Sequence, residues 1–221
     1  MEPFLHNHQY NLIAKQAKVL LSALRTSSDR KVIEAARSNA ISKSAEVCSG
    51  ADRGQMMLVE RMGDLKEPEQ LESYLSELGQ YRIPFPELSE KQIKSMFPKV
   101  KKLRLPDLDA VKGKALTYLG WTDVATNRMF LVYPGINTEE AEPRMISVEG
   151  RFTADNRKGI CAFCNRMGET VLYTAESKVR RSSIPDYYKA VGQYICADSK
   201  ECNTKITELD ALEKFLAGVT G

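Results

Sequence analysis

The sequence predicts an α+β protein, with a helical bundle over residues 1–82 and an α/β domain over residues 83–221. Apolar residues recur at helical spacing in the first part of the chain, and a bundle buries such faces. From residue 115 onward, short runs rich in Val, Ile, Tyr and Phe are typical of strands. The segment Ile83-Pro84-Phe85-Pro86 separates the helical part of the sequence from the strand-rich part, because two prolines so close cannot continue a helix.

Four helices are expected in the first part of the chain. Each carries a single apolar stripe and cannot bury it alone, so the helices should pack against one another. The polar stretch 26–29 offers N-cap side chains for the second helix, and Pro68 is well tolerated at the first position of the fourth. The expected helices cover residues 10–24, 30–47, 53–62 and 67–78.

The second part is expected to mix short strands with two helices. Ser89 is a good N-cap for a short helix over 89–96. A last helix should begin just after Cys202, with a weak capping box formed by Thr207 and Asp210. Its apolar face carries Leu209, Leu212, Phe215, Leu216 and Val219. The expected strands cover residues 115–121, 128–133, 144–152, 171–175 and 193–195.

Composition excludes several classes of protein. The apolar fraction of 43% is ordinary for a folded domain, and no run approaches the ~20 apolar residues that span a bilayer. The N-terminus lacks the basic-then-apolar pattern of a secretion signal, so we expect a cytoplasmic protein without a membrane partner. Nothing in the pattern indicates oligomers, and a monomer is expected. The acidic, turn-rich stretch 135–143 is expected to be the least ordered.

Four of the five cysteines have the spacing of metal ligands. Cys161 and Cys164 are two residues apart on an expected turn, and Cys196 and Cys202 follow after a gap of 31 residues. In a reducing compartment such clusters more often bind metal than form disulfides, although ordinary buried thiols are the alternative. An isolated four-cysteine set favours one structural Zn²⁺ over an iron–sulfur cluster. A knuckle pair followed by a ligand near a helix is the plan of a treble-clef zinc finger, here over about residues 158–221.

The remaining polar signals are weaker. Residues 91–116 hold eight bases and two acids, which is either a solvated surface or a patch for RNA phosphates. The Arg180-Arg181 pair has the same two readings. Cys48 is more often a core or surface residue than a functional one, and Trp121 is more often a core residue than a site residue. The two histidines, His6 and His8, lie far from the cysteines in the sequence and are poor candidates for a general base, so enzymatic activity is not expected.

Several strings together resemble the FusB-type fusidic acid resistance proteins, also called elongation factor G-binding proteins. The most specific are Gly120-Trp121 with Ala125-Thr126-Asn127-Arg128, and the stretch Gly192–Asn203. His8-Gln9-Tyr10-Asn11 and Val100-Lys101-Lys102-Leu103-Arg104-Leu105-Pro106 extend the resemblance toward the N-terminus. It covers nearly the whole chain.

The resemblance implies a function without catalysis. Members of this family bind the translocase EF-G, chiefly through the zinc domain, and help it leave the ribosome when fusidic acid has locked it there. The resemblance implies that the four cysteines of this sequence match the four zinc ligands of the family, each at its own position. The alternative from a different class is an RNA- or ribosome-binding zinc protein with no specific affinity for EF-G, motivated by the basic segments and tyrosines.

Only some of the residues that contact EF-G in the family are found at the matching positions of this sequence. Tyr194 is present, and so is the aromatic of the last helix, Phe215. Ile160 stands where familiar members carry Phe. Val191 replaces a basic residue, whose charge Lys189 or the Arg180-Arg181 pair would then supply.

Overall fold

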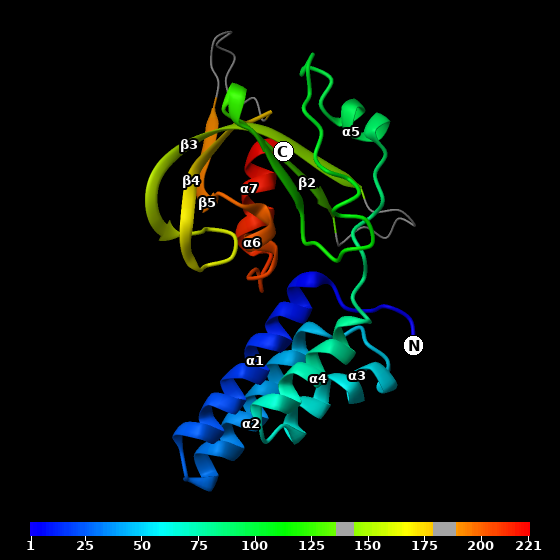
Figure 1. The fold of residues 1–221 in the computed structure, drawn as a ribbon, viewed down its shortest axis with the longest axis vertical. Coiled ribbons are helices and arrows are strands. Elements are labelled where there is room, and N and C mark those ends of the chain that lie inside the picture. The colour runs from blue at the N-terminus through cyan, green and yellow to red at the C-terminus, as the bar shows by residue number, and fades with distance from the viewer. Residues whose placement is uncertain (136–143, 179–188) are drawn as a thin grey trace. The chain divides into compact units, whose positions relative to one another are not determined.

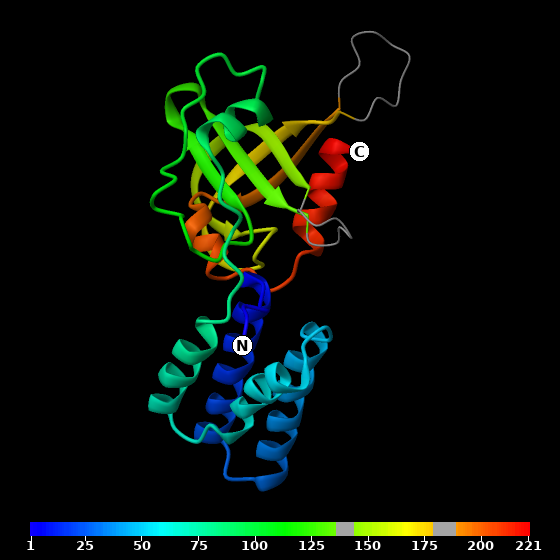
Figure 2. The same ribbon diagram turned by 90° about the vertical axis from the view of Figure 1, so that its right-hand side faces the viewer.

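The structure, a computed structural model, describes residues 1–135, 144–178 and 189–221. The chain divides into two compact units, Met1–Ile83 and Pro84–Gly221 (Figures 1 and 2). No helix in these ranges is long and apolar enough to cross a bilayer.

The first unit contains the four helices that the sequence predicts. They are α1 (Asn7–Thr26), α2 (Arg30–Val47), α3 (Arg53–Glu60) and α4 (Pro68–Gly79). The third helix is shorter than expected, because the chain tightens into a 3₁₀ turn, η1, at Arg61–Asp64. Asp52 caps α3 by accepting from the backbone N–H of Gln55 at 2.8 Å.

The bundle buries its apolar stripes in one core that includes Ile13, Leu20 and Leu78. Tyr74 also lies there, and its hydroxyl donates to the carbonyl of Val59 at 2.9 Å. Cys48 belongs to the same core, where burial raises the pKa of its thiol to about 11. Cys48 is therefore a core residue, which is one of the two non-functional positions that the sequence left open.

The second unit is built on a five-stranded antiparallel sheet in the order β1-β2-β3-β4-β5. The strands are β1 (Leu119–Asp123), β2 (Arg128–Pro134), β3 (Met145–Ile160), β4 (Met167–Glu176) and β5 (Ala190–Cys196). β3 runs eight residues beyond its predicted end at 152, with a register irregularity between Ala154 and Lys158.

The two faces of the sheet are covered differently. α6 (Ser199–Asn203) and α7 (Asp210–Thr220) pack on one face over a core that includes Leu131, Tyr173 and Phe215 (Figure 2). On the other face, α5 (Glu90–Met96) and its flanking segments cover β1 and β2 around Phe97 and Phe130. Trp121 packs in this second cluster, with its ring 5.1 Å from that of Phe130, which confirms a core role.

Two sequence predictions about the C-terminal helices are wrong. Cys202 lies inside the short helix α6, and the long helix α7 starts only at Asp210. The residue that precedes α7 is Leu209, and no side chain caps this end, so the capping box at Thr207 does not form. The chain between the helices is held instead by backbone bonds such as Ile206 N–H to the Cys202 carbonyl, at 2.9 Å.

Candidate metal centre

The first cysteine pair lies on the tight turn between β3 and β4. Asn165 adopts a left-handed conformation with φ of 51°, which lets the chain reverse. The N–H of Cys161 donates to the carbonyl of Arg166 at 3.0 Å, and the N–H of Asn165 donates to the carbonyl of Cys161 at 2.9 Å. These bonds place the Cys161 and Cys164 sulfurs on the same side of the turn as the second pair.

The second cysteine pair comes from the end of β5 and from α6. Cys196 is the last residue of β5, and Asp198 caps α6 by accepting from Lys200 N–H at 2.8 Å. A backbone bond from the N–H of Ala162 to the carbonyl of Tyr194, 2.7 Å long, joins the first turn to β5. The two pairs are therefore held together by the sheet itself.

All four cysteines are buried, and their sulfurs lie within 4.8 Å of one another. The Cys161–Cys202 and Cys164–Cys196 sulfur pairs are 3.8 Å and 3.7 Å apart. Zinc–sulfur bonds of ~2.3 Å in a tetrahedron require sulfur–sulfur edges of about 3.8 Å. The donor set therefore fits a four-coordinate Zn²⁺.

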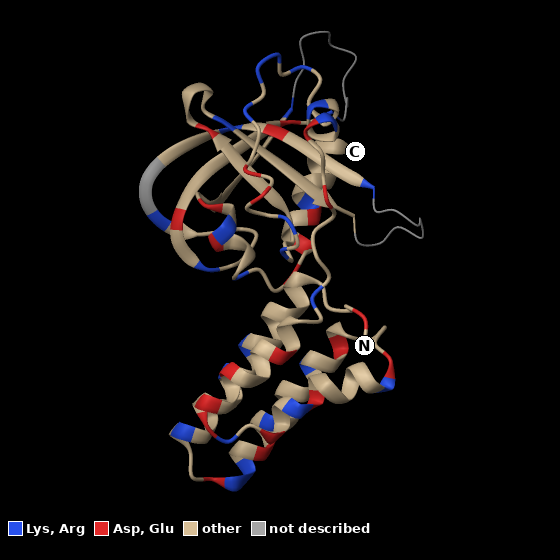
Figure 3. Ribbon diagram, turned by 45° about the vertical axis from the view of Figure 1, so that its right-hand side comes forward, with Lys and Arg blue, Asp and Glu red and all other residues tan. Residues whose placement is uncertain are grey.

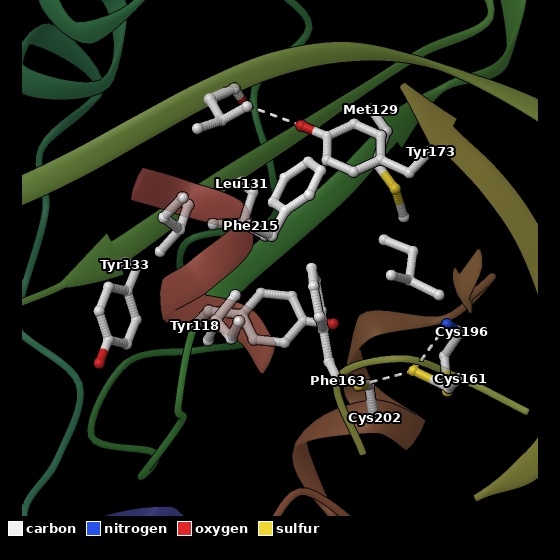
Figure 4. Close-up of a cluster of buried hydrophobic side chains, with 14 of the residues drawn as sticks. Tyr118, Met129, Leu131, Tyr133, Cys161, Phe163, Tyr173, Cys196, Cys202 and Phe215 are labelled. Carbon is white, nitrogen blue, oxygen red and sulfur yellow. Dashed lines mark hydrogen bonds between the residues drawn. The ribbon is translucent and has the colours of Figure 1, made fainter. Parts of the chain in front are cut away.

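Hydrogen bonds add to this fit. The backbone N–H of Cys196 donates to the Cys161 sulfur at 3.3 Å, as expected for a sulfur that acts as a thiolate. The thiols also compete for protons: hydrogen bonding, first with Cys164, lowers the pKa of Cys161, whereas hydrogen bonding to Cys161 raises the pKa of Cys196 and of Cys202. Burial raises the pKa of Tyr118, which lies beside these cysteines, well above its usual value. Figure 4 shows Cys161, Cys196 and Cys202 at the edge of the core.

Asn203, next to Cys202, ties the centre to the start of the sheet. Its buried side-chain oxygen accepts from the N–H groups of Thr117 and Tyr118 at 2.6 and 3.2 Å. Its amide donates to the carbonyls of Tyr118 and Ser199 at 2.9 and 2.8 Å. Because Asn203 takes up these N–H groups, β1 begins at Leu119 rather than at the predicted residue 115.

The predicted partner-facing residues separate into exposed and buried ones. Ile160 and Tyr194 are 60% and 49% exposed, and Lys189 is also exposed. Val191 is half-buried and packs against the core of the sheet domain.

Phe215 is 2% exposed, and its ring lies 5.7 Å from that of Phe163 and 5.4 Å from that of Tyr173. Phe215 therefore packs in the core, which is one of the two roles that the sequence left open for it (Figure 4). Arg180 and Arg181 lie outside the described residues.

Met167 is one residue that sequence reasoning missed. It pairs directly with Ile160 across the β3–β4 hairpin and is 62% exposed. Directly paired residues of antiparallel strands project from the same face, so these two side chains are neighbours. The alternation of side chains along a strand could have indicated that Met167 is exposed, but the predicted strand began only at residue 171, whereas β4 begins at Met167.

A closed four-cysteine centre, with ligands from a knuckle and a short helix beside an antiparallel sheet, defines a treble-clef zinc-finger protein. Two family models match the chain, "Elongation factor G-binding protein, N-terminal" over residues 4–86 and "FBP C-terminal treble-clef zinc-finger" over residues 93–215. The chain therefore belongs to the FusB-type elongation factor G-binding protein family, and its four cysteines form a structural zinc site.

A solved structure supports the same assignment. The structure of the fusidic acid resistance protein FusC is 25% identical in sequence, superposes with a TM-score of 0.81 and covers 98% of each chain. No curated protein sequence matches the chain.

Proposed function

We propose that this protein binds elongation factor G through the zinc-finger domain and promotes its release from the ribosome, which protects translation from fusidic acid. Membership of the family carries this proposal, and the similarity to FusC supports the link to the drug. A closed tetrathiolate site leaves no coordination position for a substrate, which favours binding over metal catalysis.

Exposed apolar side chains near the zinc centre supply a docking surface. Ile160 precedes the first ligand, and Met167 pairs with it. Tyr194 is two residues before the third ligand and is joined through its carbonyl to the knuckle. Singly exposed apolar residues are ordinary, but Ile160 and Met167 are paired neighbours, and exposed apolar side chains that lie together mark interaction sites. Aromatic residues such as Tyr194 are enriched among interface hot spots. Lys189, directly before β5, which carries Tyr194, adds a positive charge.

Release requires no chemistry from this protein. A partner that binds one conformation of EF-G more tightly than another shifts the population by that difference in affinity. We propose that the zinc domain prefers the conformation of EF-G that leaves the ribosome. The zinc ion would act indirectly by keeping Ile160, Met167 and Tyr194 in place.

Calorimetric titration with purified EF-G tests the docking surface. Tyr194→Ala and the double variant Ile160→Ala/Met167→Ala should each weaken binding roughly 10- to 100-fold, the range of an interface hot spot. Zinc content should stay the same. Val124→Ala is the matched control, because Val124 is a 69% exposed apolar residue of the same domain, in the turn between β1 and β2. Unchanged affinity in both test variants would overturn the proposed surface.

A second candidate function is direct binding to ribosomal RNA, with or without EF-G. The segment from Lys91 to Lys114 contains eight basic residues, and all eight are exposed (Figure 3 shows charge across both units). Among them the structure gives only Lys94 an ion pair within the described chain, with Glu90 at 3.0 Å. Exposed Lys and Arg gain affinity for phosphates by releasing counterions.

Salt dependence separates the two candidates. Binding through phosphates should weaken steeply between low and high salt, and Lys101→Glu/Lys102→Glu should reduce it. Docking through Ile160, Met167 and Tyr194 should change little with salt, because apolar contacts are not screened. Binding to EF-G that persists at high salt supports the first proposal, whereas binding only to ribosomes at low salt supports the second.

A further inference from the structure

The hydroxyl of Tyr118 is an unusual feature of the zinc domain. The side chain is 1% exposed, and its oxygen has no hydrogen-bond partner among the described residues. A buried hydroxyl without a partner is unfavourable, because it has lost its hydrogen bonds to water. Tyr133 and Tyr173 in the same core do have partners, Glu213 at 2.7 Å and the Val148 carbonyl at 3.2 Å.

The position of Tyr118 is fixed from both sides by ligand-bearing segments. Its backbone is bonded to Asn203, the residue after Cys202. Its ring meets that of Phe163, which lies between Cys161 and Cys164, edge to face at a centroid distance of 5.9 Å. Figure 4 shows the Tyr118 ring reaching past Phe163, with its oxygen on the side of the cysteines.

A zinc ion with four thiolates carries a net charge of −2 in a buried place. Such a charge is stabilised by hydrogen-bond donors that point at the sulfurs. One donor is the backbone N–H of Cys196, which contacts the Cys161 sulfur. A protonated phenol beside the cluster can donate a second hydrogen bond, which a thiolate sulfur accepts.

We propose that the Tyr118 hydroxyl donates an O–H···S hydrogen bond to the zinc-bound thiolate of Cys202 and thereby positions this ligand. Tyr118 is then an outer-sphere residue of the zinc site. In the zinc-bound protein the thiolate supplies the acceptor that the hydroxyl lacks, and the hydroxyl supplies a donor that stabilises the charge of the thiolate. The bond also links zinc binding to the entry of β1, where Tyr118 lies.

Tyr118→Phe tests this because it removes only the oxygen and keeps the aromatic ring in the core. Zinc affinity, measured by competition with a chromogenic chelator, should fall roughly 10- to 100-fold, as for other outer-sphere partners of metal ligands. In cobalt-substituted protein, the sulfur-to-metal charge-transfer band should shift. If the hydroxyl truly lacks a partner, the variant will instead be at least as stable as the wild type, with unchanged affinity and spectrum, and the proposal is overturned.

Tyr173→Phe is the matched control. Tyr173 is fully buried in the same core, but its hydroxyl donates to a backbone carbonyl instead of facing the cysteines. Its zinc affinity and cobalt spectrum should match the wild type, and an equal loss in both variants would assign the effect to the core.

A measurement on the wild-type protein does not depend on the folding of a variant. With NMR-active cadmium in the site, the slowly exchanging Tyr118 hydroxyl proton should show a scalar coupling to the metal through the hydrogen bond. Absence of this coupling, together with an unchanged affinity in Tyr118→Phe, rejects the bond.

Discussion

At the scale of single residues, the two histidines at the start of α1 make the stability of the helical unit depend on pH. Their rings stack with centroids 5.9 Å apart. Burial first, and the neighbouring His6 second, together lower the pKa of His8 from 6.5 to about 4. Between these values the unfolded chain binds a proton that the folded chain does not, so stability falls as the pH drops from 6.5 toward 4.

The pKa shift of His8 corresponds to a loss of about 2 kcal/mol of unfolding free energy between pH 7 and pH 5. His8→Gln should remove most of this pH dependence, since glutamine does not titrate. Urea unfolding at the two pH values, followed by the far-ultraviolet circular dichroism of the helices, measures the difference. A variant that loses stability with falling pH as steeply as the wild type would contradict this assignment.

Asn203 should be as important for the zinc domain as a core residue, although it is polar. Asn203→Ala removes four hydrogen bonds in a buried place, which should cost about 3 kcal/mol. Asn203→Asp keeps an acceptor but loses the two bonds donated by the amide, so an intermediate loss is expected. The fluorescence of Trp121, the only tryptophan in the sequence, follows denaturation of this unit. Equal stability of the alanine variant and the wild type would show that these bonds contribute nothing net.

At the scale of elements, β3 and β4 approach so closely that one position requires glycine. A Cβ added to Gly150 would lie 2.6 Å from the carbonyl oxygen of Thr174 and from the Tyr173 ring. Gly150→Ala should therefore destabilise the sheet by about 3 kcal/mol. Gly168→Ala, in the same hairpin, is the control, because its nearest contact would be 3.9 Å away. Denaturation followed by Trp121 should separate the two variants clearly, and equal stabilities would refute the steric argument.

The helices of the first unit could be predicted from the sequence because their signals are local. Apolar spacing and caps such as Asp52 lie within a few residues of the helix that they define. The start of β1 could not be predicted, since Asn203, the residue that takes up the N–H of Thr117, is 86 positions away. A local sequence pattern cannot reveal a hydrogen-bond partner that is so distant along the chain.

The candidate site divides in the same way. The spacing of Cys161, Cys164, Cys196 and Cys202 was sufficient to predict their convergence, because a metal imposes the geometry. Exposure was harder to foresee. Phe215 and Ile160 are both large apolar residues, and only the packed structure buries one and exposes the other. The neighbourhood of Tyr118 likewise depends on contacts between segments that are distant in sequence.

At the scale of the whole molecule, the chain consists of two units with separate cores. The helical unit is held by the apolar cluster around Ile13 and Leu78, and it contains none of the zinc ligands. In the second unit the four ligands belong to the core itself, beside Phe163 and Phe215. Zinc should therefore contribute to the stability of the second unit and not to that of the first.

Cys164→Ser tests this independence. Structural zinc contributes roughly 10 kcal/mol or more of folding free energy, which is comparable with the whole stability of a typical domain, ~5–15 kcal/mol. We therefore expect the variant to lose zinc, to lose the cooperative Trp121 transition and to lose binding to EF-G. The α1–α4 signal in circular dichroism should keep its own transition, and a chelator should reproduce the same pattern in the wild-type protein.

Cys48→Ser is the matched control for a lost thiol, since Cys48 is the one cysteine of the helical unit. It should lower the stability of the bundle modestly, because a buried thiol is replaced by a hydroxyl, and it should leave zinc and the Trp121 transition unchanged. If Cys164→Ser melted the helices as well, the units would be one cooperative structure. If it retained full affinity for EF-G, the partner surface would lie outside the zinc domain, because Ile160, Met167 and Tyr194 depend on the metal for their placement.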